Sequence, residues 1–138
     1  MFRIQRFLVA TLPLLATLAG CGGRDLALVQ GQVTFDGRPV SGGALVFSPI
    51  PAEAEREPGK SATGDIQPNG TFQLSTYRMH DGAIIGRHRV RYIPVVDDEE
   101  NAGSAVNANL SLPADMVVEI ESGKINDVAI ELVGPAPN

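Results

Sequence analysis

The chain has 138 residues, with 16 Asp or Glu and 11 Lys or Arg side chains, and its formal net charge is −5. This acidic balance argues against a general nucleic-acid binder, because phosphate contacts need clustered Lys and Arg. A single cysteine excludes an intramolecular disulfide, and two histidines leave few ligands for a zinc site. We therefore expect no nucleic-acid partner, no metal and no cofactor.

The first twenty residues have the layout of a secretory signal peptide. Two arginines lie within the first six positions, and an apolar run over residues 7–18 follows. That run is shorter than the roughly 20 residues that span a bilayer as a helix. The small residues Ala19 and Gly20 come next, and Cys21 follows them. Removal of residues 1–20 leaves 118 residues with nine basic and 16 acidic side chains, a balance of −7.

The ending Leu18-Ala19-Gly20-Cys21 resembles the bacterial lipobox. A thiol is a good nucleophile for forming a thioether, and small residues before it let a peptidase approach the backbone. The resemblance implies that Cys21 receives a diacylglyceryl group and becomes the N-terminus of an exported, membrane-anchored lipoprotein of the bacterial cell envelope. Because Gly22 rather than Asp follows, the sorting rule of enteric bacteria implies the outer membrane. The alternative is an ordinary secreted protein or an uncleaved anchor, in which Cys21 is incidental.

A very short tether links this cysteine to the next apolar segment. Residues 21–26 comprise the lipidated Cys21 and the tether, and the four residues 22–25 before the apolar segment reach at most about 14 Å when extended. We therefore expect the folded domain to sit against the membrane surface.

Beyond the tether, apolar residues alternate with a period of two, and no window has a convincing helical period. The alternation predicts strands over residues 29–35, 45–49, 62–66, 71–76, 87–93, 118–121 and 128–132. Turn signals separate them at Asp36-Gly37, Pro68-Asn69-Gly70, Asp81-Gly82 and Ser122-Gly123-Lys124. The pattern predicts an all-β fold, a single seven-stranded antiparallel Greek-key β-sandwich over residues 27–133 with a tail over 134–138. Exposed loops are expected over residues 49–59 and 94–115.

Four segments resemble carboxypeptidase-regulatory-like domains, which are transthyretin-like (prealbumin-like) sandwiches. They are Gly31-Gln-Val-Thr-Phe-Asp-Gly-Arg-Pro-Val40, Leu45-Val-Phe-Ser-Pro49, Asn69-Gly-Thr-Phe-Gln-Leu74 and Asp81-Gly-Ala-Ile-Ile-Gly-Arg-His-Arg-Val90. In the last of these, His88 stands where an aromatic residue is usual. The resemblance implies a non-catalytic envelope module and no fixed ligand, since the fold hosts unrelated functions.

One strand carries the candidate binding residues. Arg87, Arg89 and Arg91 alternate along residues 87–93 and place three cations on one face, a candidate surface for an anionic lipid, a polysaccharide or a partner protein. The alternative is charge pairing across the sheet, because Glu119, Glu121 and Glu131 share the outward phase of the last two strands. This pairing is the interpretation that we favour.

The remaining candidates for chemistry are weaker. His80 is expected in a loop and His88 at an inward position, and no nucleophile motif accompanies either. The transthyretin-like family includes a hydrolase with a C-terminal Tyr-Arg-Gly-Ser, which the ending over residues 134–138 lacks. The acidic run over residues 97–100 lacks the spacing of a calcium loop, so we interpret it as a solvated loop.

Together these patterns favour a non-catalytic envelope lipoprotein whose β-sandwich has a structural or protein-interaction role. A carbohydrate-binding or adhesion module is the first alternative, and a transthyretin-like hydrolase is the second. Four mature aromatic residues, Phe35, Phe47, Phe72 and Tyr92, are expected to point inward. Tyr77 is then the obvious aromatic residue left for stacking on a sugar.

Overall fold

A computed structural model describes residues 24–54, 57–95 and 108–135. Ten strands lie in this part of the chain: β1 (Leu26–Ala27), β2 (Val29–Phe35), β3 (Arg38–Pro39), β4 (Ala44–Pro49), β5 (Ala62–Asp65), β6 (Thr71–Gln73), β7 (Ala83–Ile84), β8 (Gly86–Ile93), β9 (Val117–Ile120) and β10 (Asn126–Glu131). No helix occurs among these residues, as the absence of a helical period predicts. Each of the seven predicted strands overlaps one of the ten, but the predicted count of seven is too low. The other three, β1, β3 and β7, have two residues each.

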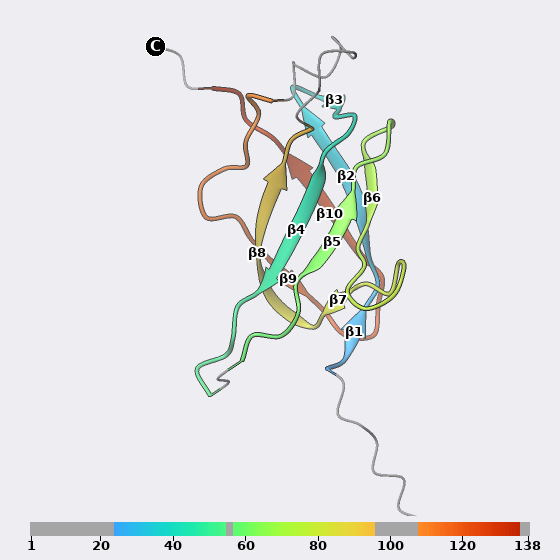
Figure 1. Cartoon of the computed structure of the whole chain (residues 1–138), viewed down its shortest axis with the longest axis vertical. Helices are drawn as coiled ribbons and strands as arrows, with labels where there is room; N and C mark the ends of the chain where they lie inside the picture. Colours follow the sequence, from blue (N-terminus) through green and yellow to red (C-terminus); the bar gives the residue numbers. More distant parts are fainter. Residues whose placement is uncertain (1–23, 55–56, 96–107, 136–138) are drawn as a thin grey trace, which may run out of the picture.

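The strands form two four-stranded sheets and one short pair (Figure 1). One sheet has the order β5-β4-β8-β9, and the other has the order β10-β2-β3 with β6 also paired to β2. β1 pairs with β7 at the lower end of the view, and β3 lies at the upper end. A single hydrophobic core takes side chains from both four-stranded sheets, which is the layered arrangement of a β-sandwich.

Side chains fill the core as the period-two pattern predicts. Phe47 and Phe72 come from opposite sheets, and their ring centroids lie 6.3 Å apart in a tilted arrangement. Phe35 and Tyr92, also expected to point inward, are half-buried and pack against this core. His88 is fully buried, as predicted, and stacks at a tilt beside Phe47.

The hairpin turn at residues 68–70 forms a corner between the two sheets. Gly70 has a φ of 83°, and its amide donates to the carbonyl of Gln67. The strands that this turn joins belong to different sheets, since β5 pairs with β4 while β6 pairs with β2. An isolated bridge between Thr63 and Ser75 keeps β5 and β6 in register across the corner. The two sheets are therefore continuous along this edge.

The expectation of a purely antiparallel sandwich is wrong at one pair of strands. β10 pairs with β2 in parallel, with Asn126 opposite Val29 and Glu131 opposite Thr34. The turn at residues 122–124 forms, but β9 and β10 then enter different sheets, so the crossing chain reaches β2 in the same direction. A local turn signal specifies a reversal and not the sheet that the next strand joins.

At Gly31, the backbones of β2 and β10 approach each other closely. A Cβ atom at Gly31 would lie 1.8 Å from the carbonyl oxygen of Val128 and 2.9 Å from the Phe72 ring. Both neighbours are fixed, one by the β10 backbone and the other by the core. Only a residue without a side chain therefore fits at this point of β2.

We predict that Gly31→Ala lowers the free energy of unfolding by about 3 kcal/mol, because the methyl group forces β2 and β10 apart. Urea unfolding followed by circular dichroism measures the change. Gly134→Ala is the matched control, since a Cβ there meets only the Phe35 ring at an ordinary 3.5 Å. A Gly31→Ala protein as stable as the Gly134→Ala protein would contradict the parallel register.

Candidate binding surfaces

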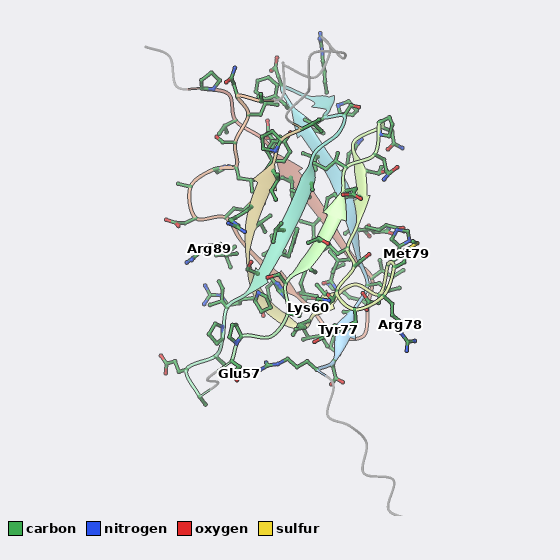
Figure 2. The ribbon with its side chains drawn as sticks, viewed as in Figure 1. Glu57, Lys60, Tyr77, Arg78, Met79 and Arg89 are labelled. Carbon is green, nitrogen blue, oxygen red and sulfur yellow. The ribbon has the colours of Figure 1, made fainter. Side chains whose placement is uncertain are left out.

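The predicted arginine face lies on the outer side of β8. Arg87, Arg89 and Arg91 are all exposed, while His88 and Val90 between them are buried. Figure 2 shows Arg89 projecting from the ribbon into solvent. Strand alternation thus places the three cations on one outward face, as the sequence indicates.

The structure agrees only in part with the favoured interpretation, in which the arginines of β8 pair with glutamates on neighbouring strands. Arg87 lies opposite Glu119 in the β8–β9 register, but Glu131 is on β10 in the other sheet. Among the described residues the ion pair that forms is between Lys124 and Glu121, and it does not involve an arginine of β8. The alternation of inward and outward residues predicted that Glu131 would face the arginines. The strands β9 and β10 alternate in the same way but belong to different sheets, so Glu131 lies on the sheet that does not contain β8.

A small hollow adjoins the arginine face. It has a volume of about 350 Å³, and it is lined by Arg89, Arg91, Ser48 and residues 49–51. The end of β4 at Pro49 shapes this hollow, because the chain leaves the sheet there into the predicted exposed loop. Two guanidinium groups beside a proline-lined hollow suit an anionic or acidic group.

A larger groove, which the sequence did not reveal, lies on the sheet of β2 and extends onto β5 of the first sheet. Its volume is about 1020 Å³, and its walls come from β2, β5, β6, β10 and the loop after Ser75. The register places Gln30 opposite Gln73 on β6 and opposite Asp127 on β10, so polar side chains form adjacent rows. We call this surface the glutamine groove. Its polar lining residues are Gln30, Gln32, Gln67, Gln73, Thr63, Thr71, Ser75, Asp65, Asp127 and His80.

Hydrogen bonds fix two of the amides in the groove. The Gln30 Nε2 donates to Asp127 Oδ1 at 2.8 Å, and the Gln32 Nε2 donates to the Asn69 carbonyl at 3.2 Å. Because the Nε2 group of each side chain is held by a hydrogen bond, the direction of the amide oxygen is also fixed. The signal in the sequence was the outward phase of Gln30, Gln32 and Gln73, but their convergence depends on pairing between distant strands.

The loop after Ser75 forms one wall of the groove and is held by a single carboxylate. Asp81 accepts hydrogen bonds from the amides of Thr76 at 2.6 Å, Arg78 at 2.8 Å and Tyr77 at 3.0 Å. The Thr76 hydroxyl donates to the Gly82 carbonyl at 2.7 Å. This Asp81-capped loop (residues 75–82) projects Tyr77, Arg78 and Met79 outward (Figure 2).

These hydrogen bonds lower the pKa of the Asp81 carboxyl. Burial acts to raise the pKa of the Asp81 carboxyl, but hydrogen bonds from the Thr76, Arg78 and Tyr77 amides outweigh it and leave the pKa below its ordinary 3.8. A lowered pKa in the folded state means that the charged carboxylate stabilises the fold above the unfolded-state pKa. That contribution is lost as the pH falls through the folded-state pKa.

We predict that Asp81→Asn lowers the free energy of unfolding by about 1 kcal/mol at pH 7, because charge-assisted bonds to the loop amides are weakened. The difference from the unmodified protein should begin to shrink below about pH 4, where the unfolded chain takes up a proton at Asp81, and it should be lost as the pH falls through the lower folded-state pKa. Urea unfolding at pH 7 and pH 3 measures both values. Asp115→Asn, at an exposed carboxylate with a φ of 55° that Asn also adopts, is the control. A difference as large at pH 3 as at pH 7 would contradict the role of the Asp81 charge.

The two histidines do not come together. The His88 Nε2 donates to the Ile84 carbonyl at 2.6 Å, and the ring is inaccessible. His80 is exposed in the Asp81-capped loop, as predicted, with a φ of 55°. Within residues 24–54, 57–95 and 108–135, no group of three or more His, Cys, Asp or Glu side chains could hold a metal ion.

Several predicted features lie outside the described residues. They are the segment 1–20, Cys21 and the acidic run over residues 97–100. In the part that is described, no helix is long and apolar enough to cross a membrane. Comparisons of the chain with protein-family models, curated proteins and solved structures find no match.

Proposed function

We propose that this chain is an exported bacterial lipoprotein, held at the envelope membrane through Cys21, with a β-sandwich that acts as a non-catalytic structural or protein-interaction module. The observation that carries the proposal is the sequence Leu18-Ala19-Gly20-Cys21 at the end of a short apolar run. Gly22 after the cysteine favours the outer membrane. The resemblance of four strand-and-turn segments to carboxypeptidase-regulatory-like domains supports the module.

The arginine face supports an interaction role for the sandwich. Three exposed guanidinium groups on β8 concentrate positive charge on a protein whose formal net charge is negative. Such a patch favours encounter with an acidic protein surface or an anionic polymer and disfavours contact between two copies of itself. We therefore assign partner binding to the face that carries Arg87, Arg89 and Arg91.

We predict that the protein expressed in a bacterial host incorporates an alkyne-tagged fatty acid and that Cys21→Ser abolishes the labelling, because Cys21 carries the only thiol. In-gel fluorescence after click coupling measures it. Ser122→Cys, added to Cys21→Ser, is the control and should not restore the label, since lipidation requires the lipobox and not merely a thiol. Absence of label from the unmodified protein, or equal label in Cys21→Ser, would refute the anchor.

A carbohydrate-binding role is the second candidate, and the glutamine groove favours it. Amides both donate and accept hydrogen bonds, and the carboxylates of Asp65 and Asp127 accept them, which matches the hydroxyl groups of a neutral sugar. No Lys or Arg lines the groove, so its lining does not suit an anion. Its one aromatic lining residue, Phe72, is 2% exposed and offers no stacking face. We therefore expect weak binding, with a Kd of about 1 mM.

We predict that Gln30→Ala with Gln73→Ala weakens binding of a neutral hexasaccharide by about tenfold, the loss of hydrogen bonds at two adjacent amides. Titration calorimetry with cellohexaose, maltohexaose and chitohexaose measures it, and the double variant Arg89→Glu with Arg91→Glu should leave that binding unchanged. With alginate as an anionic probe, the arginine variant should lose binding and the glutamine variant should not. If the neutral sugars bind both variants equally, or bind neither the variants nor the unmodified protein, the groove is not a carbohydrate-binding site.

A further inference from the structure

Seven large apolar side chains are exposed among the described residues, and three of them share one end of the sandwich. Leu28, Tyr77 and Ile125 are 49%, 56% and 53% exposed, and all three lie at the end where β1 begins. Leu28 precedes β2, and Ile125 precedes β10, and the parallel pairing brings the starts of these two strands together. Ile93 ends β8 and Val133 lies just beyond β10, both at the opposite end of the sandwich, while Met79 lines the glutamine groove and Val117 begins β9.

Buried polar contacts hold this end in one arrangement. Asn126 is buried, and its side-chain amide accepts from the Glu121 amide at 2.9 Å and donates to the Glu121 carbonyl at 3.0 Å. Its backbone amide donates to the Leu28 carbonyl at 2.8 Å. The turn that carries Ile125 is therefore fixed beside Leu28. The three hydrogen bonds satisfy polar groups that burial would otherwise leave unpaired. The positions of Leu28 and Ile125 are therefore fixed before either residue meets a partner.

The Asp81-capped loop joins the same end. A Cβ atom at Gly82 would lie 1.9 Å from the Ala27 carbonyl oxygen and 2.9 Å from the Leu28 Cα, so the loop packs directly on the start of β2. The backbone amide of Tyr77 donates a hydrogen bond to the Asp81 carboxylate, and the Lys60 ammonium lies 5.3 Å from the centroid of the Tyr77 ring. Figure 2 shows Lys60, Tyr77 and Arg78 together at the lower end of the molecule.

The chain enters the fold at this end too. Arg24, the first described residue, donates from Nη2 to the Glu57 carbonyl, and Ile85 donates to the Asp25 carbonyl at 3.1 Å. Cys21 precedes Arg24 by three residues, which reach at most about 11 Å. If Cys21 is lipidated as proposed, Arg24 lies within that distance of the anchored residue, and the chain enters the fold at the end that carries Leu28, Tyr77 and Ile125.

We propose that this end of the sandwich, formed by Leu28, Lys60, Tyr77, Arg78 and Ile125 and here called the docking end, rests in the interfacial layer of the phospholipid bilayer. The inference depends on the proposed lipid anchor and adds the orientation of the domain on the membrane. Tyr is favoured at membrane–water interfaces, where its ring is apolar and its hydroxyl is wet. Lys and Arg beside it reach headgroup phosphates while their stems cover apolar surface.

Charge alone does not drive the contact. Asp25 and Glu57 lie at the same end as Lys60 and Arg78, so the docking end is of mixed charge. The contact is instead made by apolar side chains in the interface, while the cations select the headgroup layer. Both zwitterionic and anionic bilayers should therefore be contacted, with anionic lipid strengthening the contact.

The chain has no tryptophan, which makes a direct test available. Tyr77→Trp and Ile125→Trp place a single reporter at the docking end, and Ile93→Trp places one at the opposite end with a similar exposure of 49%. The full-length chain, purified from bacterial membranes, is reconstituted into vesicles of phosphatidylcholine with and without phosphatidylglycerol. Brominated lipids quench a tryptophan that touches the bilayer interface.

We expect brominated lipid to quench tryptophan at positions 77 and 125 roughly twofold more than at position 93, with emission shifted to shorter wavelength. Lys60→Glu with Arg78→Glu in the Tyr77→Trp protein should reduce quenching in vesicles that contain phosphatidylglycerol. Arg38→Glu, on β3 at the other end, is the matched control and should not. Equal quenching at positions 77, 125 and 93 would overturn the proposal.

Vesicle flotation separates this outcome from failure of the anchor. Protein that floats with the vesicles but shows equal quenching retains its anchor and refutes only the docking end. Protein that does not float refutes the anchor, and the docking end falls with it. Urea midpoints of each variant show whether it is folded, and the two reporters at positions 77 and 125 keep the test decisive if one of them is destabilised.

Discussion

The parallel pairing of β2 with β10 is the constraint on which the other surfaces depend. β2 lies between β10 on one side and β3 and β6 on the other, so it carries the register of its whole sheet. Gly31 lets Val128 and Phe72 approach a strand backbone that any side chain would push away. Because this approach occurs between segments nearly 100 residues apart in the sequence, the sheet cannot form from local hairpins alone.

Two surfaces follow from that pairing. On its outer face, the register aligns Gln30 with both Gln73 and Asp127, which makes the floor of the glutamine groove. At its start, it brings Leu28 and Ile125 to the same end of the sandwich, where Asn126 locks them in place. An antiparallel β10 would have put Ile125 at the opposite end. The positions of the docking end and of the groove thus both depend on the parallel direction of β10.

The Asp81-capped loop connects these two surfaces. Its Met79 and His80 line the groove, and its Tyr77 and Arg78 belong to the docking end. One carboxylate that accepts three backbone amides gives an exposed loop a fixed shape, which lowers the entropy lost when the loop meets a partner. A membrane at the docking end would leave the groove along the side and the arginine face on the other sheet open to solvent.

Period-two alternation, with turn residues between the strands, was enough to predict the seven main strands and the all-β class, together with the outward arginines, the buried His88 and the exposed Tyr77. These features are local, because successive side chains in a strand point to opposite faces whatever the strand pairs with. The lipobox proposal likewise rests on a few adjacent residues. Which sheet each strand joins, and in which direction, was decided only by the tertiary structure. The parallel β10, the glutamine groove, the position of Glu131 and the gathering of Leu28, Tyr77 and Ile125 all depend on long-range packing, which a turn signal does not encode.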